Sequence, residues 1–455
     1  MTEGHLRFGT DGVRGPANTE LTPELALALG RAAAAVLDCP RWVVGRDTRL
    51  SGPMLEAALA AGLASQGAQV EMVGILPTPG VAQLADRDDA AAAVISASHN
   101  PWTDNGIKFF SRGGRKLTDD TEARIEAVLG GLTDPRTPKR TLPRTEGNVG
   151  SIEPRSDAVD RYVDHLVSTL GERDLAGLHV VLDCAHGAAG PVAGRVFEHL
   201  GARTEVMNAE SDGRDINAGC GSTDPSGLAR AVVAGRADLG LAFDGDADRL
   251  IAVAHDGSLV DGDHLMAMFA RDMDLRGELV DHTLVVTVMS NLGLRLACEE
   301  AGIRVLTTPV GDRHVLDALD SGGYVLGGEQ SGHIIFADRA RTGDGILAGL
   351  LVADLVKRSR VTLAELARRS MTASPQVLVN VEVDHRHPRI AEELAEEITA
   401  AEGRLGPRGR VLVRPSGTEP LIRVMVEAPT SQLAGEVADG LAGTVERRFG
   451  RRPPD

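Results

Sequence analysis

Residues 94–110 read VISASHNPWTDNGIKFF, an apolar run followed by a polar turn and a second apolar segment. The apolar run predicts a short buried strand through Ile95, which the turn chemistry after it ends. Pro101 disfavours helix at Asn100 and so holds the loop open. Ligands of α/β proteins usually bind at strand ends. We therefore interpret Ser98 as a candidate hydroxyl nucleophile, with a simple strand-to-turn junction as the alternative.

Lys108 lies ten residues after Ser98 and is one of only four lysines among the 48 basic residues of the chain. Arginine supplies positive charge almost everywhere else in this sequence. A lysine at this place indicates that a proton has to move, because a guanidinium group does not release one. An ordinary partly buried lysine is the alternative.

Length and composition limit the fold and the class of function. A chain of 455 residues predicts three or four domains, and 3% aromatic residues predict cores of Ala, Val, Leu and Ile, which suit helices packed on parallel sheets. A formal net charge of -17 argues against a nucleic-acid partner. Four cysteines without CxxC spacing, and the lack of a signal-peptide pattern or a membrane-spanning apolar run, predict a cytoplasmic protein.

Helices and strands alternate ahead of the Ser98 stretch. The opening loop, Phe8–Gly15, carries three glycines that free its backbone, and Arg14, which is able to reach a phosphate. The βαβαβ alternation that follows indicates a doubly wound sheet. Its helices are expected over 21–37, 53–67 and 77–85, and its strands over 41–45 and 68–73. The Pro-, Gly- and Thr-rich residues 130–154 mark a domain boundary.

Two further α/β units and a smaller α+β domain follow this boundary. The α/β units have strands expected over 179–183, 204–206, 238–243, 283–288, 304–307 and 324–327, and helices over 191–200, 263–273 and 292–301. The α+β domain has strands expected over 377–383, 410–413 and 421–427, and helices over 388–401 and 431–447.

Three aspartates follow the apolar strand 238–243 in the sequence DGDADR, residues 244–249. Carboxylates at alternate positions with small residues between them can surround one Mg²⁺, which takes oxygen ligands. The segment does not fit a calcium EF-hand, because Arg249 stands where that loop needs Gly and His255 where it needs Glu. A solvated acidic turn is the alternative.

Two later loops carry groups suited to a phosphorylated sugar. Glu329 and Ser331 lie two residues apart in GEQSGH, residues 328–333, and suit sugar hydroxyls, although a structural turn is the better explanation of this motif taken alone. The segment RPSGTEP, residues 414–420, with Arg423 beyond it, combines glycine-freed amides, hydroxyls and arginines. That combination predicts a phosphate-binding loop, with a plain hairpin turn as the alternative.

Together these motifs resemble the α-D-phosphohexomutase superfamily. The resemblance rests on Ser-His-Asn-Pro at 98–101, on the segments 244–249, 328–333 and 414–420, and on their order along nearly the whole chain. Further traits at 9–15, 216–222 and 308–313 resemble the branch that acts on glucosamine phosphates. His314 departs from that branch, which commonly has Tyr there, and this departure bears on the specificity loop.

The resemblance implies a four-domain α/β architecture with the active site in a central cleft. Three similar mixed-sheet α/β domains are expected at 1–150 (phosphoserine loop), 151–257 (metal loop) and 258–370 (sugar loop), with an α+β domain at 371–455 (phosphate loop). It also implies conversion of glucosamine 6-phosphate to glucosamine 1-phosphate through a phosphoserine and a 1,6-bisphosphate, for UDP-N-acetylglucosamine and cell-wall synthesis.

The resemblance also implies roles for the candidate residues. One Mg²⁺ per subunit is expected on Ser98, Asp244, Asp246 and Asp248, with glucosamine or glucose 1,6-bisphosphate as activator. Lys108 is expected to transfer protons, with His99 or His333 as helpers, while Arg14 and Arg249 stabilise phosphoryl charge. The substrate-binding residues expected are Glu329, Ser331, Arg313, Arg414, Ser416, Gly417, Thr418 and Arg423. A phosphosugar is the expected partner, without nucleic acid or membrane, for a monomer or homodimer.

Three alternatives remain at this point. The same chemistry on another sugar gives a phosphomannomutase or a phosphoglucomutase. A metal-dependent phosphatase would use Asp244 as its nucleophile. A non-catalytic phosphosugar-binding protein would have kept the fold and lost the reaction.

Overall fold

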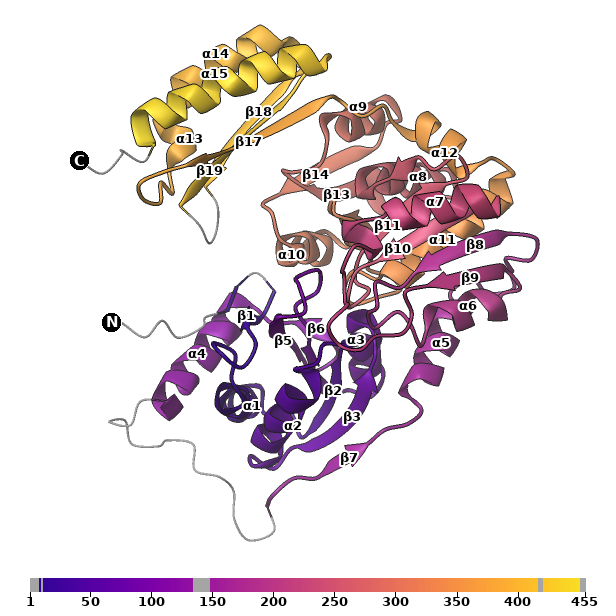
Figure 1. Cartoon of the computed structure of the whole chain (residues 1–455), viewed down its shortest axis with the longest axis vertical. Helices are drawn as coiled ribbons and strands as arrows, with labels where there is room; N and C mark the ends of the chain where they lie inside the picture. The colour runs from indigo at the N-terminus through magenta and orange to yellow at the C-terminus, as the bar shows by residue number, and fades with distance from the viewer. Residues whose placement is uncertain (1–7, 10, 134–147, 416–419, 451–455) are drawn as a thin grey trace. The chain divides into compact units, whose positions relative to one another are not determined.

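The structure is a computed structural model that describes residues 8–9, 11–133, 148–415 and 420–450. It divides into two compact units, which we describe in turn (Figure 1). Unit 1 comprises Met1–Met289 and Ile303–Arg368, and unit 2 comprises Ser290–Gly302 and Arg369–Asp455. None of the helices in the described ranges is both long and apolar enough to cross a membrane.

The first sheet of unit 1 is mixed and has the strand order β1-β5-β4-β2-β3-β7, with β6 paired to β5. Strands β2, β3, β4 and β7 run parallel, whereas β5 runs antiparallel to both β1 and β4. The strands are β1 (Val13–Pro16), β2 (Arg41–Arg46), β3 (Gln69–Ile75), β4 (Ala91–Ile95), β5 (Asp104–Ser111), β6 (Arg115–Lys116) and β7 (Ile152–Pro154).

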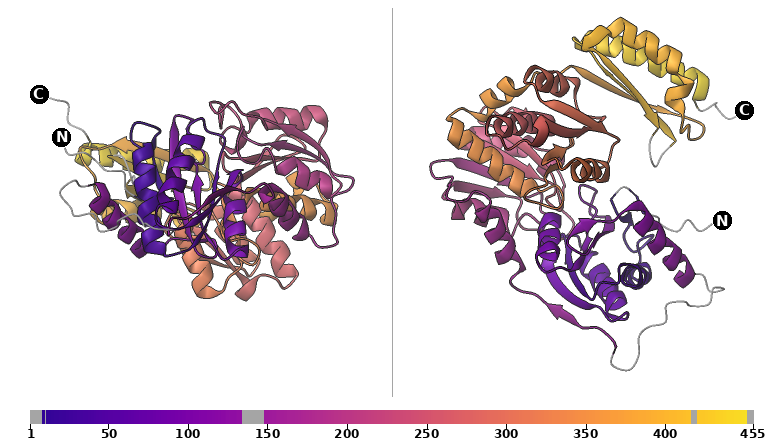
Figure 2. Two further views of the ribbon diagram at one scale, coloured as in Figure 1. Left: turned by 90° about the horizontal axis from the view of Figure 1, so that it is seen from below. Right: turned by 180° about the vertical axis from the view of Figure 1, so that it is seen from behind.

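Helices cover both faces of this sheet. On one face α1 (Pro23–Leu37), α2 (Gly52–Ala64) and α4 (Asp119–Thr133) share one apolar core with the strands, and α1 lies beside α2 (Figures 1 and 2). The other face carries α3 (Thr78–Arg87), which packs on β2 and β4. Helix α1 begins where Thr22 accepts a hydrogen bond from the Leu25 amide, and it ends at Asp38 in the left-handed conformation.

One expectation for this region needs correction. The opening loop expected at 8–15 contains β1, whose pairing with β5 satisfies its backbone. At the end of the boundary segment expected at 130–154, β7 pairs with the edge of the first sheet through β3. A three-residue strand carries too little periodicity to be predicted.

The second and third sheets of unit 1 repeat the mixed pattern, with orders β12-β11-β10-β8-β9 and β14-β13-β15-β16. In each, parallel central strands end in an antiparallel hairpin. The second has β8 (His179–Asp183), β9 (Arg203–Met207), β10 (Leu239–Phe243), β11 (Leu250–Ala254), β12 (Leu259–Val260), α5 (Ala158–Ser168), α6 (Ala193–His199) and α7 (Ser226–Gly235). The third has β13 (Thr283–Thr287), β14 (Arg304–Thr308), β15 (Leu326–Gly328), β16 (Ile334–Phe336), α8 (Gly262–Leu275), α10 (Asp312–Gly322), α11 (Gly345–Ser359) and α12 (Leu363–Ser370).

Unit 2 packs helices on one antiparallel sheet of order β17-β19-β18. The buried carboxylate of Glu427 links the sheet to α9 by accepting a hydrogen bond from the Leu292 amide at 3.1 Å. The same carboxylate forms an ion pair with Arg410 at 2.9 Å. The helix expected over 388–401 is broken, because buried Leu394 leaves helical geometry between α13 and α14. The elements are α9 (Leu292–Glu300), β17 (Gln376–Glu382), α13 (Ile390–Glu393), α14 (Ala395–Leu405), β18 (Arg410–Pro415), β19 (Leu421–Glu427) and α15 (Ser431–Phe449).

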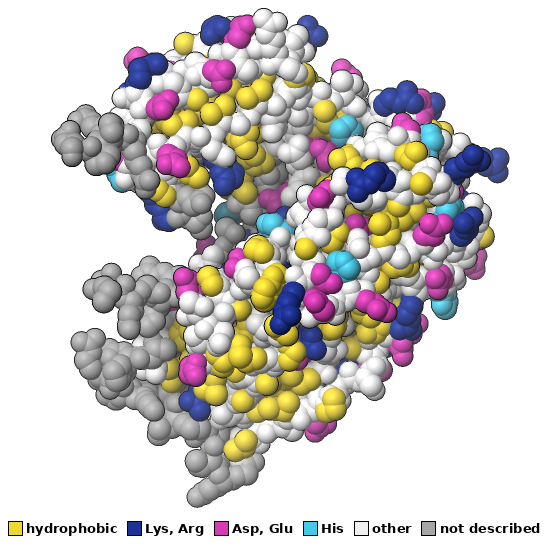
Figure 3. All heavy atoms as spheres, in the orientation of Figure 1, with side chains coloured by type: hydrophobic (Ala, Val, Ile, Leu, Met, Phe, Trp, Pro, Cys, Tyr) yellow, Lys and Arg dark blue, Asp and Glu magenta, His cyan; other side chains and the backbone are white. Residues whose placement is uncertain are grey.

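Charges of both signs are mixed on the surface. On the face drawn in Figure 3, Lys and Arg side chains are interspersed with Asp and Glu side chains. The acidic side chains on that face are therefore distributed among basic ones.

Candidate active site

Ser98 lies in a sharply turned loop directly after β4, as the sequence predicts. Its backbone is in the left-handed region, with φ of 53°, and its side chain is buried. The Ser98 hydroxyl donates a hydrogen bond to Oδ2 of Asp244 at 2.6 Å, and Nδ1 of His99 lies 3.2 Å away. The strained turn aims the hydroxyl at the carboxylates of the neighbouring sheet.

Arg49 holds this loop, residues 96–101, in place. Its buried guanidinium donates to the carbonyl oxygens of Ser98 and Asn100, both at 2.8 Å. It also donates to the carbonyls of Pro101 and, at 3.0 Å, Asp104.

Asp47 links this arginine to the backbone of the loop. Oδ2 of Asp47 accepts hydrogen bonds from Nε of Arg49 at 2.9 Å and from the Ser96 hydroxyl at 2.7 Å. The Ser96 hydroxyl oxygen in turn accepts a hydrogen bond from the Ser98 amide. The side-chain amide of Asn217 adds a further donor to the Ser98 carbonyl at 2.9 Å.

Asp244, Asp246 and Asp248, hereafter the Asp triad, follow the fully buried strand β10. One carboxylate oxygen from each lies within 4.8 Å of the others, and all three residues are buried. The Thr78 hydroxyl donates to Oδ2 of Asp246 at 2.6 Å. Oδ1 of Asp246 and Oδ1 of Asp248 are buried acceptors without a hydrogen-bond partner. Such oxygen atoms suit a hard cation, so these residues fit Mg²⁺.

Two carboxyl groups of the triad, those of Asp244 and Asp248, have pKa values shifted in opposite directions. Burial raises the pKa of Asp244 well above its ordinary value, and the charges of Asp248 and Asp246 add to this effect. Burial acts on Asp248 in the same direction, but Lys108 and His333 outweigh it and hold the pKa of that carboxyl well below its usual range. A divalent cation among them would offset the mutual repulsion.

Lys108 extends from β5 into the triad. Its Nζ lies 2.7 Å from Oδ2 of Asp246, 3.3 Å from Oδ2 of Asp248 and 2.8 Å from Oδ2 of Asp11. Burial acts to lower the pKa of Lys108, but the three carboxylates outweigh burial and hold it well above its ordinary value. In this arrangement Lys108 is an ammonium group that can donate a proton.

The remaining cations and histidines expected at the site lie around this cluster. The Arg14 guanidinium donates to Asp11, and the Arg249 amide donates to Oδ1 of Asp244 at 3.2 Å. Burial, together with the charges of Arg249 and Arg14, lowers the pKa of His99 to about 4, so its imidazole is neutral at physiological pH. Nδ1 of His333 lies 3.7 Å from Oδ1 of Asp248, while its Nε2 accepts the Gly343 amide at 3.2 Å.

The sugar-loop residues are placed differently from one another. Glu329 follows β15 and accepts the Gly311 amide at 3.2 Å, and Ser331 is exposed beyond it. Arg313, on α10, pairs instead with Asp119 and Glu122 of α4. Arg313 would reach a substrate only after leaving these carboxylates.

The phosphate-loop residues lie in unit 2, where Arg414 and Arg423 are paired positions on β18 and β19. Burial and the charge of Arg423 lower the pKa of Arg414, and Nε of Arg423 is buried without a hydrogen-bond partner. An anion would satisfy both groups. Ser416, Gly417 and Thr418 lie outside the described residues.

The sequence reading missed several residues that build the site. Arg49 was not among the expected site residues, and the motif at 216–222 does not indicate that Asn217 contacts the Ser98 carbonyl. No pattern connects Asp11 to Lys108 or Thr78 to the triad, because those contacts join segments more than 90 residues apart.

Four sequence families match consecutive parts of the chain. All are described as phosphoglucomutase/phosphomannomutase domains: alpha/beta/alpha domain I at residues 5–134, alpha/beta/alpha domain II at 160–257, alpha/beta/alpha domain III at 261–374 and the C-terminal domain at 378–444. The fold and the serine, aspartate and lysine site therefore define a phosphohexomutase, which confirms the expected superfamily and fold class. The exact domain boundaries stay predictions.

Comparison with individual known proteins identifies the family within this class. A phosphoglucosamine mutase of Rhodococcus opacus is 54% identical over 446 residues, covering 96% of this chain and 98% of its own length. The chain belongs to the phosphoglucosamine mutase family. A phosphoglucomutase/phosphomannomutase family structure from Burkholderia thailandensis is 26% identical with a TM-score of 0.81, covering 96% of this chain and 97% of that one. An N-acetylphosphoglucosamine mutase of Aspergillus fumigatus, solved with GlcNAc-6P and magnesium, shares the fold at 19% identity, with a TM-score of 0.66 and coverage of 97% and 95%.

Proposed function

We propose that this protein interconverts glucosamine 6-phosphate and glucosamine 1-phosphate through a phosphoserine at Ser98. The observation that carries the proposal is the buried Ser98 hydroxyl, 2.6 Å from the Asp triad, to which Lys108 is paired. The names and full-length similarity of the relatives support glucosamine as the sugar. The product would serve the synthesis of UDP-N-acetylglucosamine and the cell wall.

The Asp triad and the phosphoryl group on Ser98 would hold Mg²⁺. When bound, the ion supplies positive charge that offsets the phosphoryl oxygens and eases transfer. The unpartnered oxygens of Asp246 and Asp248 support this assignment. Glucosamine or glucose 1,6-bisphosphate would act as activator by phosphorylating Ser98.

The transfer itself exchanges one P–O bond for another. The bond from phosphorus to Oγ of Ser98 breaks as the bond to the sugar 1-hydroxyl oxygen forms, giving the 1,6-bisphosphate. The sugar 1-hydroxyl loses a proton, and Oγ of Ser98 gains one. Lys108 would relay this proton, with His99 or His333 as helpers. After the intermediate turns end for end, Ser98 takes back the 6-phosphate. Arg14 and Arg249 would stabilise the transferring group.

Two loops would keep hold of the sugar in both orientations. Glu329 and Ser331 would bind its hydroxyls, and Arg313 would join them. Arg414, Arg423 and the loop 416–418 would bind the phosphate that is not reacting. We propose that the enzyme acts in the cytoplasm as a monomer or homodimer.

The test is peptide mapping of the purified protein before and after incubation with glucosamine 1,6-bisphosphate and Mg²⁺. We expect phosphate on the peptide that holds Ser98, and loss of both phosphate and mutase activity in Ser98→Ala. Ser111→Ala is the matched control, because that hydroxyl bonds only the Arg115 carbonyl at 3.1 Å in β6 and should leave activity unchanged.

Two outcomes would contradict the proposal. Phosphate on Asp244, with activity retained in Ser98→Ala, would establish the phosphatase alternative. Faster turnover of mannose or glucose 6-phosphate than of glucosamine 6-phosphate would move the substrate to another sugar.

A further inference from the structure

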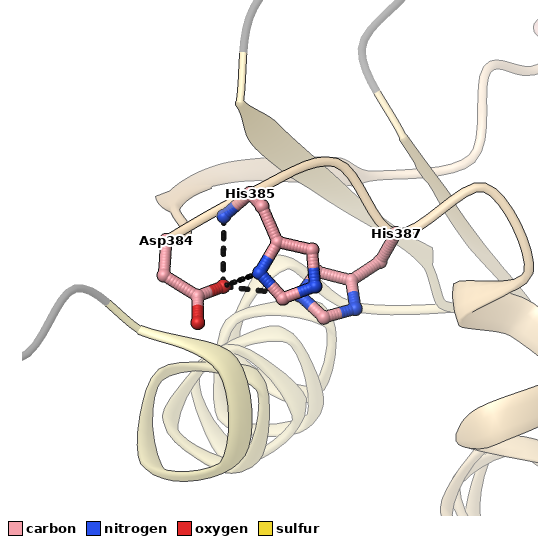
Figure 4. A group of neighbouring side chains, drawn as sticks. All are labelled: Asp384, His385 and His387. Atoms are coloured by element: carbon pink, nitrogen blue, oxygen red, sulfur yellow. Dashed lines mark hydrogen bonds and ion pairs between the residues drawn. The ribbon is translucent and has the colours of Figure 1, made fainter.

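Unit 2 contains a cluster of two histidines and one aspartate that the mutase reaction does not use. Asp384, His385 and His387 lie in the loop after β17 and point toward one another (Figure 4). Oδ1 of Asp384 lies 2.8 Å from Nδ1 of His385 and 3.3 Å from Nε2 of His387. The two imidazole rings lie with their centres 4.2 Å apart and their planes tilted by 37°.

These separations are those of ligands that share a small metal ion. Zinc binds imidazole nitrogen at about 2.0–2.1 Å in tetrahedral geometry, which places neighbouring ligand atoms roughly 3.3 Å apart. All three potential ligand atoms lie within 4.8 Å of one another. The cluster offers one carboxylate oxygen and two imidazole nitrogens, which is a common ligand set for a divalent transition metal.

A second carboxylate supports His387 from its other side. Oε2 of Glu393, at the end of α13, lies 4.0 Å from Nδ1 of His387, the nitrogen that faces away from Asp384. In metal sites a carboxylate that accepts a hydrogen bond from this nitrogen orients the imidazole, and Glu393 lies on that side of the ring, although 4.0 Å is beyond hydrogen-bond distance. His387 is itself nearly buried and packs against the Phe449 ring at 4.6 Å.

The cluster lies where three elements of unit 2 meet. The Asp384 amide donates to the Phe449 carbonyl at 3.2 Å, and Val383 pairs with Gly450. The loop therefore joins the end of β17 to the end of α15, and Glu393 adds α13. An ion bound here would fix all three.

We propose that Asp384, His385 and His387 form a binding site for a divalent transition-metal ion of the zinc class, which stabilises unit 2. The site differs in chemistry from the Asp triad, because nitrogen ligands favour zinc whereas a set of carboxylate oxygens favours Mg²⁺.

The test uses the full chain, stripped of metal with a chelator and titrated with Zn²⁺ in excess Mg²⁺ to occupy the Asp triad. We expect zinc bound at the cluster, measured by equilibrium dialysis, together with a rise in Tm. His387→Gln and His385→Gln should each weaken this binding on the order of 100-fold, and Glu393→Gln about 10- to 100-fold.

His282→Gln is the matched control. His282 is exposed and lies 2.5 Å from Asp274, but among the described residues it belongs to no group of three potential metal ligands, so its loss should leave zinc binding unchanged. The proposal fails if the stripped protein binds no zinc beyond what the Asp triad accounts for. It fails equally if His385→Gln, a change at an exposed position that should not disturb folding, binds zinc as tightly as the unchanged chain.

Discussion

At the scale of single residues, Arg49 determines the shape of the Ser98 loop. Its guanidinium serves four carbonyl oxygens of that loop and the start of β5, and Asp47 compensates its charge. A planar group with five donors can meet all these acceptors at once, whereas an ammonium group cannot. Arg49 thus positions the loop that carries Ser98, the proposed nucleophile.

Arg49→Lys should lower kcat on the order of 100-fold while changing KM little, because the charge opposite Asp47 remains but the loop loses most of its donors. Steady-state kinetics on glucosamine 6-phosphate measures this effect. Arg112→Lys is the control, since Arg112 makes only an exposed pair with Asp89. A rise in KM with kcat unchanged would show that Arg49 serves substrate binding instead.

The residues that could be predicted from the sequence are those whose chemistry is local. Ser98 and the Asp triad stand in short motifs after apolar strands, so residue type and spacing predict them as site candidates. The rarity of lysine in the chain singles out Lys108 in the same way, but it does not predict the carboxylates that Lys108 contacts. Arg49 and Asp11 act through contacts with distant segments, which a single sequence does not display.

At the scale of elements, the reversed strand β5 explains how Lys108 reaches the triad. Sequence alternation predicted parallel strands joined by helices, whereas β5 folds back antiparallel to β4 and places Lys108 beside Val94. This hairpin sets the lysine and the Ser98 loop at the same edge of the sheet. The connection between the two strands, residues 96–103, is too short for a parallel crossover, so its length indicates the hairpin although the alternation of elements does not.

A buried hydrogen bond joins α5 to the start of α11. The Tyr162 hydroxyl donates to Oδ2 of buried Asp344 at 2.7 Å, and Oδ1 of Asp344 caps α11 by accepting the Leu347 amide at 2.9 Å. Burial raises the pKa of Asp344 to about 6, although these hydrogen bonds oppose the rise. In the folded protein Asp344 therefore stays protonated at pH values where an ordinary carboxyl group is ionised. The free energy of unfolding falls as the pH rises from the ordinary carboxyl pKa to about 6 and levels off above that pH.

Tyr162→Phe should destabilise unit 1 by about 1–3 kcal/mol at pH 7.5, because the ionised Asp344 then keeps a buried oxygen without its donor. The loss should be smaller at pH 5, where the carboxyl is protonated in the folded state. Calorimetry at both pH values measures the difference. Tyr324→Phe, at the only other tyrosine, whose hydroxyl meets Arg304 at the surface, should show no such pH dependence.

At the scale of the whole molecule, the chain forms two units with separate apolar cores. The core of unit 2 is drawn from its own sheet and from α13, α14 and α15, while α1 and α2 pack on the first sheet of unit 1. Each unit has an apolar core of its own, so each is expected to unfold cooperatively by itself. Unfolding should then reveal two transitions.

A pair of core substitutions tests this independence. Leu441→Ala, in α15, and Leu59→Ala, in α2, each remove a buried side chain, at a cost of about 2–5 kcal/mol. Leu441→Ala should lower the Tm of one calorimetric transition by roughly 10 °C and leave the other in place, because unit 2 is small enough for this loss to shift its transition strongly. Leu59→Ala should shift only the other transition. If either variant moved both transitions together, the two units would unfold as one, and ligand binding in one unit would be expected to stabilise the other.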